Sequence, residues 1–212
     1  MAYSPDEQLL EQWVSRERLT RYRSAREDTV ALYLWNAALS AQLLEMIGHV
    51  EVLLRNAVHA KLAPHSPDQK WYLDSHYNFS SVANRSIDTA RNAAKRGGQV
   101  EIPGKVVAEL MFGFWRFLFS ARYQSTIWPR VKTAFQGVPA HARDRAKLEE
   151  VVIRVHDLRN RVAHHEPVFH QPVHQHVADL IFIAGYVDDR AARMLADQTT
   201  IFDLLSRRPP IA

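Results

Sequence analysis

Cysteine is absent from the 212-residue chain, which excludes disulfide bonds, thiolate metal sites and cysteine nucleophiles. The opening stretch MAYSPDEQLLEQW also lacks the basic and then apolar pattern of a secretory signal peptide. No apolar run approaches the roughly 20 residues that a membrane span needs, since even ADLIFIAGYV is followed by Asp188 and Asp189. We therefore expect a soluble, cytoplasmic protein without a membrane partner.

Glycine is scarce, with seven residues, and the hairpin signals Asn-Gly and Asp-Gly do not occur. Hydrophobic residues make up 47% of the chain, and long runs rich in Ala, Leu, Arg and Glu favour helices. No internal repeat, low-complexity linker or shift of composition divides the chain. The sequence therefore predicts an all-α fold with a single domain over residues 1–212, a core at about 20–190 and a short mobile tail at about 207–212.

Acidic residues are slightly outnumbered, because 27 Lys and Arg face 23 Asp and Glu for a formal net charge of +4. This balance permits a nucleic-acid partner without requiring one. Basic residues gather in RERLTRYRSAR and RNAAKR, and each cluster also fits a solvated helix face.

Apolar periodicity and helix-breaking residues predict a series of helices. Ser4-Pro5-Asp6-Glu7 has the pattern of a helix start with Ser4 as the cap, and this helix should reach about Arg23. The longest periodic run, about 27–62, should form one amphipathic helix with a kink near Gly48. Further helices are expected at about 80–96, from Pro103 through PGKVVAELMFGFWRFLFSARY, at about 140–165 and at about 173–197.

The stretch HDLRNRVAHHEPVFH, residues 156–170, brings four histidines, two arginines, an asparagine and two carboxylates together near a predicted helix end. Adjacent His164 and His165 diverge by roughly 100° on a helix, and no carboxylate-x-x-His pattern is present, which argues against a zinc or iron site. The metal alternative would use His165, His170, His174 and His176.

General acid–base chemistry fits these residues better. Histidine titrates near neutral pH, arginine offers a fixed positive fork that matches phosphate, and asparagine can orient either group. Such groups can cleave a phosphodiester with the 2′-hydroxyl of RNA as the nucleophile. On a straight helix Arg159 and His164 differ by roughly 140°, whereas Asn160 and His164 share a face. A composite site across a two-fold axis, or a distorted last turn, would bring Arg159 to His164.

A purely structural interpretation also fits the same residues. Arg159 could pair with Asp157, and Asn160 could bond to the backbone at the helix end. His164 or His165 could interact favourably with the negative end of the helix dipole.

The segment LRNRVAHHEP resembles the R-x4-H signature of HEPN-domain proteins in their Abi-like branch, which are bacterial proteins linked to abortive phage infection. The blocks LYLWNAALSAQLLEMIGHVEVLLRNAVHAKL (32–62) and VVAELMFGFWRFLFSARYQSTIWP (106–129) are similar to other recurrent blocks of that family and follow the same order. The resemblance covers about residues 20–190. It implies a HEPN-like helical bundle with additional helices.

The resemblance also implies an activity, namely a homodimeric, metal-independent endoribonuclease that needs no cofactor and acts as a toxin or phage-defence effector. Arg159 would hold the scissile phosphate, His164 would transfer the proton and Asn160 would position either, with His165 in reserve. RNA would be the substrate, and an antitoxin or a phage-derived trigger would be a further partner. The alternative is a non-catalytic module that binds RNA or protein, as other members are. The chain departs from many members in having Glu-Pro-Val-Phe after the histidines.

A second polar set lies on the long predicted helix, where Glu51, Arg55 and His59 line one face at steps of four. It could form a structural polar layer that ties this helix to the helix of the motif. It could instead orient the side chains of the motif from behind. Asp157 and Glu166 are further candidates for that supporting role.

Overall fold

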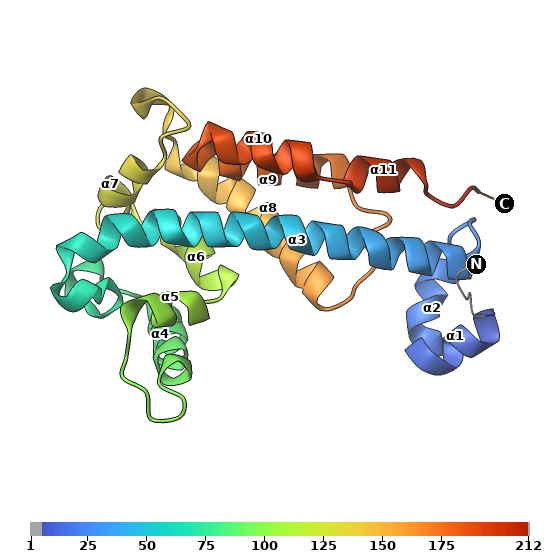
Figure 1. Ribbon diagram of the computed structural model, residues 1–212, viewed down its shortest axis with the longest axis horizontal. Coiled ribbons are helices and arrows are strands. Elements are labelled where there is room, and N and C mark those ends of the chain that lie inside the picture. Colours follow the sequence, from blue (N-terminus) through green and yellow to red (C-terminus); the bar gives the residue numbers. More distant parts are fainter. Residues whose placement is uncertain (1–5, 212) are drawn as a thin grey trace.

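The computed structural model describes residues 6–211, and helices dominate it (Figure 1). These are α1 (Glu7–Val14), α2 (Arg16–Arg23), α3 (Thr29–Leu62), α4 (Ser81–Ala94), α5 (Pro103–Glu109), α6 (Phe112–Leu118), α7 (Trp128–Val131), α8 (Arg145–Ala163), α9 (Val173–Val187), α10 (Asp189–Gln198) and α11 (Ile201–Ser206). The described residues form no strand, and one isolated antiparallel bridge joins Glu27 to Ile211. The predicted all-α fold is confirmed.

The long helix α3 is the central element of the fold. Its N-terminus is capped by Asp28, whose carboxylate accepts a hydrogen bond from the backbone N–H of Ala31 at 2.8 Å. Buried side chains recur at three- and four-residue steps along its whole length, from Leu32 to Leu62. The expected kink near Gly48 is absent from this described helix. A single glycine lowers helix propensity but keeps its backbone hydrogen bonds, so the helix continues through it.

By length and composition α3 is also the one helix among the described residues that could cross a membrane, with a mean hydropathy of 1.4 over its most apolar 18 residues. The sequence led us to expect no segment long and apolar enough to span a membrane, and by length and composition α3 is an exception. The same helix supplies much of the hydrophobic core, and core helices reach comparable hydropathy.

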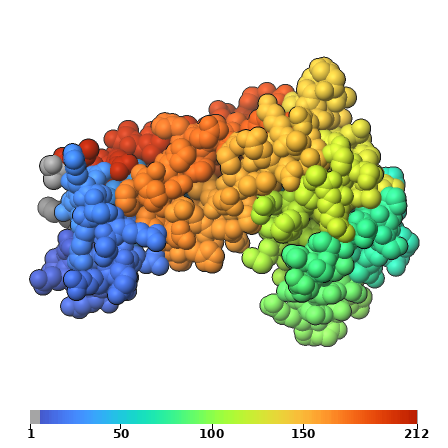
Figure 2. Space-filling model, turned by 180° about the vertical axis from the view of Figure 1, so that it is seen from behind, coloured from blue at the N-terminus to red at the C-terminus, as the bar shows by residue number. Residues whose placement is uncertain are grey.

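Two groups of short helices project from one side of α3, while α9, α10 and α11 lie along the other side (Figure 1). The first projection is α1 with α2, near the start of α3, and the second is α4 with α5, near its end. The C-terminal end of α8 emerges between the two. Figure 2 shows the surface hollowed beneath α8, between the blue N-terminal projection and the green one.

The N-terminal helix differs from the prediction in its start and in its continuity. The proposed cap Ser4 lies outside the described residues, and in the structure Asp6 caps α1 by accepting from the N–H of Leu9 at 2.8 Å. The helix then breaks at Ser15, which has a φ of 76° and caps α2. Ion pairs from Arg23 to two carboxylates of α1 hold the two short helices against each other.

Two further predicted helices are each divided in two. The apolar run after Pro103 breaks between α5 and α6, where the indole N–H of Trp115 donates to the freed carbonyl of Leu110 at 3.0 Å. The last long helix breaks at Asp188, whose carboxylate accepts from the N–H of Arg190 at 2.8 Å and so caps α10. In both places a side chain satisfies the backbone groups that the break exposes.

The C-terminal tail, for which we expect mobility, contacts the body of the protein at its described residues. The Arg208 guanidinium pairs with Glu27 at 2.7 Å and donates to the carbonyl of Phe169 at 2.9 Å. Ile211 forms the isolated bridge with Glu27.

Candidate functional site

The motif occupies the last turns of α8, and the way this helix ends determines how its histidines are presented. Asp144 caps the start of α8, and the helix ends at Ala163. The N–H of His164 still bonds to the carbonyl of Asn160 at 2.9 Å, but His165 has a φ of 55° and the chain turns away. A non-glycine residue in this left-handed region is uncommon. The turn leaves both histidines exposed.

Arg159 is half-buried and lines two separate hollows of the surface. Within residues 6–211 no carboxylate forms an ion pair with it, whereas its neighbour Arg161 pairs with Glu166 at 3.0 Å. On α3, burial raises the pKa of Glu51, and the positive charges of Arg159 and Arg55 oppose part of that rise. Arg159 thus acts on a carboxyl group of α3 through its charge, without an ion pair to it.

Arg159 lies on the border of two grooves. The first, here called the α2–α8 groove, has a volume of about 960 Å³ and is lined by α1, α2, α3 and α8. His165 shares this groove with Arg159, and Trp13 forms part of its wall with an exposed fraction of 61%. The second, here called the α4–α8 groove, has a volume of about 600 Å³ and is lined by α4, α6 and α8 together with Glu109 and Met111. Asn160 shares this one with Arg159.

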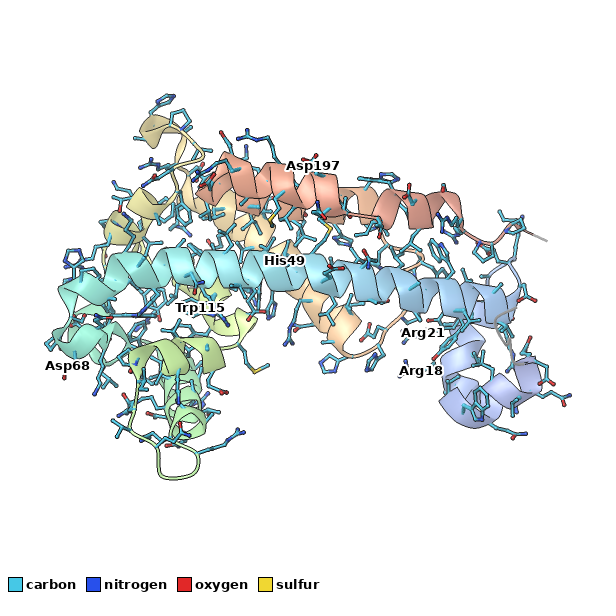
Figure 3. All side chains as sticks on the ribbon, viewed as in Figure 1. Arg18, Arg21, His49, Asp68, Trp115 and Asp197 are labelled. Carbon is cyan, nitrogen blue, oxygen red and sulfur yellow. The ribbon has the colours of Figure 1, made fainter. Side chains whose placement is uncertain are left out.

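His164 lines neither of these grooves. It lies in a smaller hollow of about 310 Å³ with Arg18 and Arg21 of α2. Figure 3 shows these two arginines extending from α2 toward the end of α8. The Arg18 guanidinium donates to the carbonyl of His165 at 2.7 Å and so links α2 to the turn after the motif. Within one chain, Arg159 and His164 therefore do not line a common groove.

His156 is a neighbour of the motif to which we assigned no role from the sequence. Its ring stacks on Phe112 with centroids 6.1 Å apart, and the amide nitrogen of Asn160 lies 3.3 Å from its Nε2. It lines the α4–α8 groove together with Arg159 and Asn160. The sequence signal was its spacing of four residues from Asn160, which places both on one helix face. Gly113 lies over the ring, because a Cβ at that position would be 3.3 Å from Nε2.

The residues proposed to support the motif divide in the structure. Glu51 alone of the α3 set faces Arg159. Arg55 donates to the carbonyl of Ala108 at 3.4 Å, and Nδ1 of His59 accepts from the indole N–H of Trp71 at 3.0 Å, so both bond outside the motif. Burial lowers the pKa of His59, in keeping with this acceptor role.

The two acidic candidates of the motif contact its flanks. Exposed Asp157 lies 3.3 Å from Nδ1 of His156, and Glu166 pairs with Arg161. Neither carboxylate forms an ion pair with Arg159 in the described part of the chain.

The histidines of the metal alternative are dispersed. His170 is exposed, His174 stacks on Phe202 with centroids 5.5 Å apart, and His176 is buried. Residues 6–211 contain no group of three or more His, Asp or Glu side chains placed to hold a metal ion.

A buried asparagine fixes the segment that follows the motif. Oδ1 of Asn36, on α3, accepts from the N–H groups of Val168 and Phe169 at 2.8 and 3.0 Å. Its amide nitrogen lies 3.0 Å from the hydroxyl oxygen of Tyr22 on α2, to which it donates. One side chain therefore joins α2, α3 and the chain after the motif.

Comparison with known proteins places the chain in a family. No curated protein and no solved structure is significantly similar to it. The model of one family, described as Abi-like protein, matches residues 8–170, which is well over half of the chain and includes α2 to α8, all but the first residue of α1, and the motif. The chain therefore belongs to the Abi-like protein family.

Proposed function

We propose that this protein is an endoribonuclease that cleaves RNA through the 2′-hydroxyl of the substrate. Membership of the Abi-like family suggests a role in abortive infection or defence. The nuclease activity is a more specific proposal within that role. The observation that carries the proposal is the setting of Arg159. It forms no ion pair with a carboxylate of the described chain, and it lies at the border of two grooves that also contain His156, Asn160 and His165. An unpaired guanidinium in such a place is suited to bind phosphate.

The proposed chemistry needs only these protein groups and the RNA. A histidine takes the proton of the 2′-hydroxyl, and the resulting oxygen attacks the adjacent phosphorus. The bond from phosphorus to the 5′-oxygen breaks, and a protonated histidine gives that oxygen its proton. Arg159 offsets the negative charge on the phosphoryl oxygens in the transition state. The products are a 2′,3′-cyclic phosphate and a 5′-hydroxyl.

A second copy of the chain would complete this site. Arg159 and His164 do not line a common groove in one chain, but the hollows that they line adjoin, because Arg18 and His165 line both. The α2–α8 groove also has apolar side chains that are exposed to solvent in the single chain, including Trp13 at 61% and Leu44 at 46% exposure. Exposed apolar patches of this kind commonly mark protein interfaces. A homodimer with Arg159 of one copy beside His164 of the other fits both observations.

The separation of Arg159 from His164 also supports a rival, a non-catalytic Abi-like protein whose basic hollow binds RNA or a protein partner such as an antitoxin. The rival predicts RNA binding without cleavage. In cells it predicts that expression is equally well tolerated for the wild type and for His164→Ala.

The main experiment incubates purified protein with labelled RNA and with its all-deoxy counterpart in EDTA and maps the product ends. We expect RNA to be cut to 2′,3′-cyclic phosphate and 5′-hydroxyl ends and DNA to survive, because DNA lacks the 2′-oxygen. Activity that requires Mg²⁺ or Mn²⁺ and yields 5′-phosphate ends would contradict the mechanism. RNA that binds and stays intact would favour the rival.

Mixing two inactive variants tests the composite site. In a dimer of Arg159→Ala with His164→Ala, one site would have both mutated residues and the other would retain both wild-type residues. We expect activity to return on mixing if the pair acts across the dimer. If it acts within one chain, mixing restores nothing. Light scattering that gives a monomer of 24.4 kDa at working concentrations would also exclude a dimeric site.

A further inference from the structure

Helix α4 presents one face to the α4–α8 groove. Seven residues of this segment line the groove at successive steps of one or three, namely Val82, Arg85, Ser86, Thr89, Ala90, Ala93 and Arg96. This spacing is that of one helix face, continued by Arg96 in the turn that follows α4. The hydroxyl groups of Ser86 and Thr89 donate to backbone carbonyls of α4, so the arginines are the free donors of this wall.

The basic residues of this segment fall into two groups. Arg91 pairs with Glu101 at 3.0 Å, and Lys95 lies 4.0 Å from the same carboxylate. Arg85 and Arg96 are exposed on the groove side, and neither forms an ion pair within residues 6–211. Glu101 therefore neutralises the basic residues of this segment that do not line the groove, while the charges of Arg85 and Arg96, which line it, are free to bind a ligand.

The opposite wall of the groove adds the charge of Arg159, with Asn160 and His156 beside it. Among the lining residues Glu109 is the one carboxylate, against three arginines. The α4–α8 groove is thus positively charged and ends at Arg159, the phosphate-binding residue of the proposed site. Arginines that are spread along a groove, rather than gathered at one point, match the repeating charge of a nucleic-acid backbone.

Apolar side chains of α6, and of Met111 directly before it, form another part of the α4–α8 groove. Phe117 and Met111 line the groove and are 41% and 63% exposed, and the Arg116 guanidinium lies over the Phe117 ring at 5.3 Å from its centroid, as a cation beside a stacked base would. An exposed phenylalanine ring beside arginines is a surface on which unpaired bases stack, and such stacking tolerates any base. This combination favours a single RNA strand over an acidic protein, which would use the charges but not the ring.

We propose that the α4–α8 groove is the path of the RNA strand on one side of the scissile phosphate, with Arg85 and Arg96 bound to backbone phosphates and Phe117 stacked on a base. This inference rests on the proposed function, because it places the scissile phosphate at Arg159. Arg85 and Arg96 are eleven positions apart, or about 16 Å along a helix, so they contact different phosphates.

The test measures binding of a single-stranded RNA with 2′-O-methyl groups, which cannot be cleaved through the 2′-oxygen, over a series of salt concentrations in EDTA. For Arg85→Ala/Arg96→Ala we expect affinity about tenfold weaker or more, and a plot of log affinity against log salt that is shallower by about 1.4, or about 0.7 for each phosphate that is no longer bound. Arg85→Lys/Arg96→Lys keeps both charges and should retain most of the slope. Circular dichroism and thermal unfolding confirm that each variant is folded.

The matched control is Arg193→Ala/Arg207→Ala. It removes two exposed arginines from α10 and from the end of α11, which lie across α3 from α4 (Figure 1). We expect its slope to stay at the wild-type value. An equal loss in the control and the groove variant would mean that net charge acts at long range, and this would overturn the proposal. An unchanged slope in the groove variant would also overturn it and would leave the groove to an acidic protein partner.

Cleavage is measured separately, on ordinary RNA with the wild-type protein. If the wild type cleaves and the groove variant keeps its salt slope, the strand path is wrong and the proposed function stands. If the wild type binds RNA without cleaving it and the groove variant loses the slope, the proposed function fails, and the groove stands as a path for a bound RNA strand without a scissile phosphate.

Discussion

Arg154 and Arg159 lie five residues apart on α8 and have opposite surroundings. Arg154 forms a two-pronged ion pair with Asp179 of α9, at 2.7 and 2.8 Å, and a further bond to Glu150 at 2.6 Å. Asp179 is buried whereas the Arg154 side chain is 36% exposed, so this pair joins α8 to α9 at the edge of the core. Arg159 has no ion pair in the described chain and lies at the border of two grooves. The difference separates an arginine that joins two helices from one that we propose binds the phosphate of the substrate.

The largest expected effect is the loss of activity at the open arginine. Arg159→Ala should lower the rate of RNA cleavage by about 10²-fold or more, because the transition-state charge loses its donor. Arg159→Lys should restore little, since a lysine cannot offer the planar fork. The free energy of unfolding should change by no more than about 1 kcal/mol, because no ion pair is broken.

The measurements are cleavage rates under single-turnover conditions and urea unfolding. Arg193→Ala serves as the control for loss of an exposed arginine. The comparison with Arg154 breaks down if Arg159→Ala unfolds the protein or leaves cleavage at the wild-type rate.

The paired arginine should show the reverse behaviour. Arg154→Ala leaves the buried carboxylate of Asp179 with the hydrogen bond from Gln175 but without its cation, and should lower the free energy of unfolding by about 2 kcal/mol, since the Arg154 side chain is partly exposed. Burial by itself would raise the pKa of Asp179, but hydrogen bonds from Arg154 and Gln175 leave it lowered. The pair therefore stabilises the wild type above the unfolded pKa of about 3.9, and this contribution is lost as the pH falls through the folded pKa.

Urea unfolding at neutral and acid pH measures both effects. The double variant Arg154→Met/Asp179→Leu should recover much of the loss, because no charge stays buried. A single variant as stable as the wild type would show that the pair does not join α8 to α9 as argued.

Arg18 is an intermediate case, since its guanidinium bonds to the carbonyl of His165 rather than to a carboxylate. Arg18→Ala should cost about 1 kcal/mol of stability, because the site is exposed and water can replace the donor. The turn that carries His164 and His165 should lose protection from hydrogen exchange. Arg26→Ala, an exposed arginine without an ion pair in the described chain, provides the control. Unaltered exchange at the turn would show that Arg18 does not restrain it.

The smallest effect concerns His176, which is buried near Arg154 and whose ring nitrogens have no hydrogen-bond partner within residues 6–211. Burial lowers its pKa, with Asp179 opposing the shift and Arg154 and Arg161 adding to it. The unfolded chain therefore takes up the proton first, so the free energy of unfolding should fall as the pH drops below about 6.5. His176→Leu should flatten that dependence in unfolding curves between neutral and mildly acid pH. An equally steep dependence in the variant would assign it to other groups.

Helices with a long, uninterrupted apolar period could be predicted from the sequence, and α3 is the clearest example. The breaks at Ser15 and Asp188 could not, because a serine or an aspartate within a helical pattern can cap a new helix or lie on a solvated face. Which of these occurs depends on packing. The ion pairs from Arg23 to Glu7 and Glu11, for example, require α1 and α2 to fold against each other.

The candidate site was predictable in its residues but less so in its surroundings. The pattern of Arg159, Asn160 and His164 is local and visible in the sequence. His156 was missed because its partner Phe112 lies 44 positions away and contacts it through the fold alone. The face of α3 with Glu51, Arg55 and His59 was predicted as one unit, yet each residue meets a different neighbour.

Asn36 makes the region around the motif a single cooperative unit. Its one amide group bonds to the hydroxyl of Tyr22 and to two backbone N–H groups after the motif, and Arg18 of α2 bonds to the carbonyl of His165, so moving α2 away from α3 breaks bonds at the asparagine and at the turn together. Opening of the N-terminal projection and loosening of the chain after His165 are thus one event rather than two. The amide protons of Val168 and Phe169 should exchange with solvent at the same rate as those of the last turn of α2, with a shared opening free energy. A ligand that widens the α2–α8 groove would therefore also move the turn that carries His164 and His165.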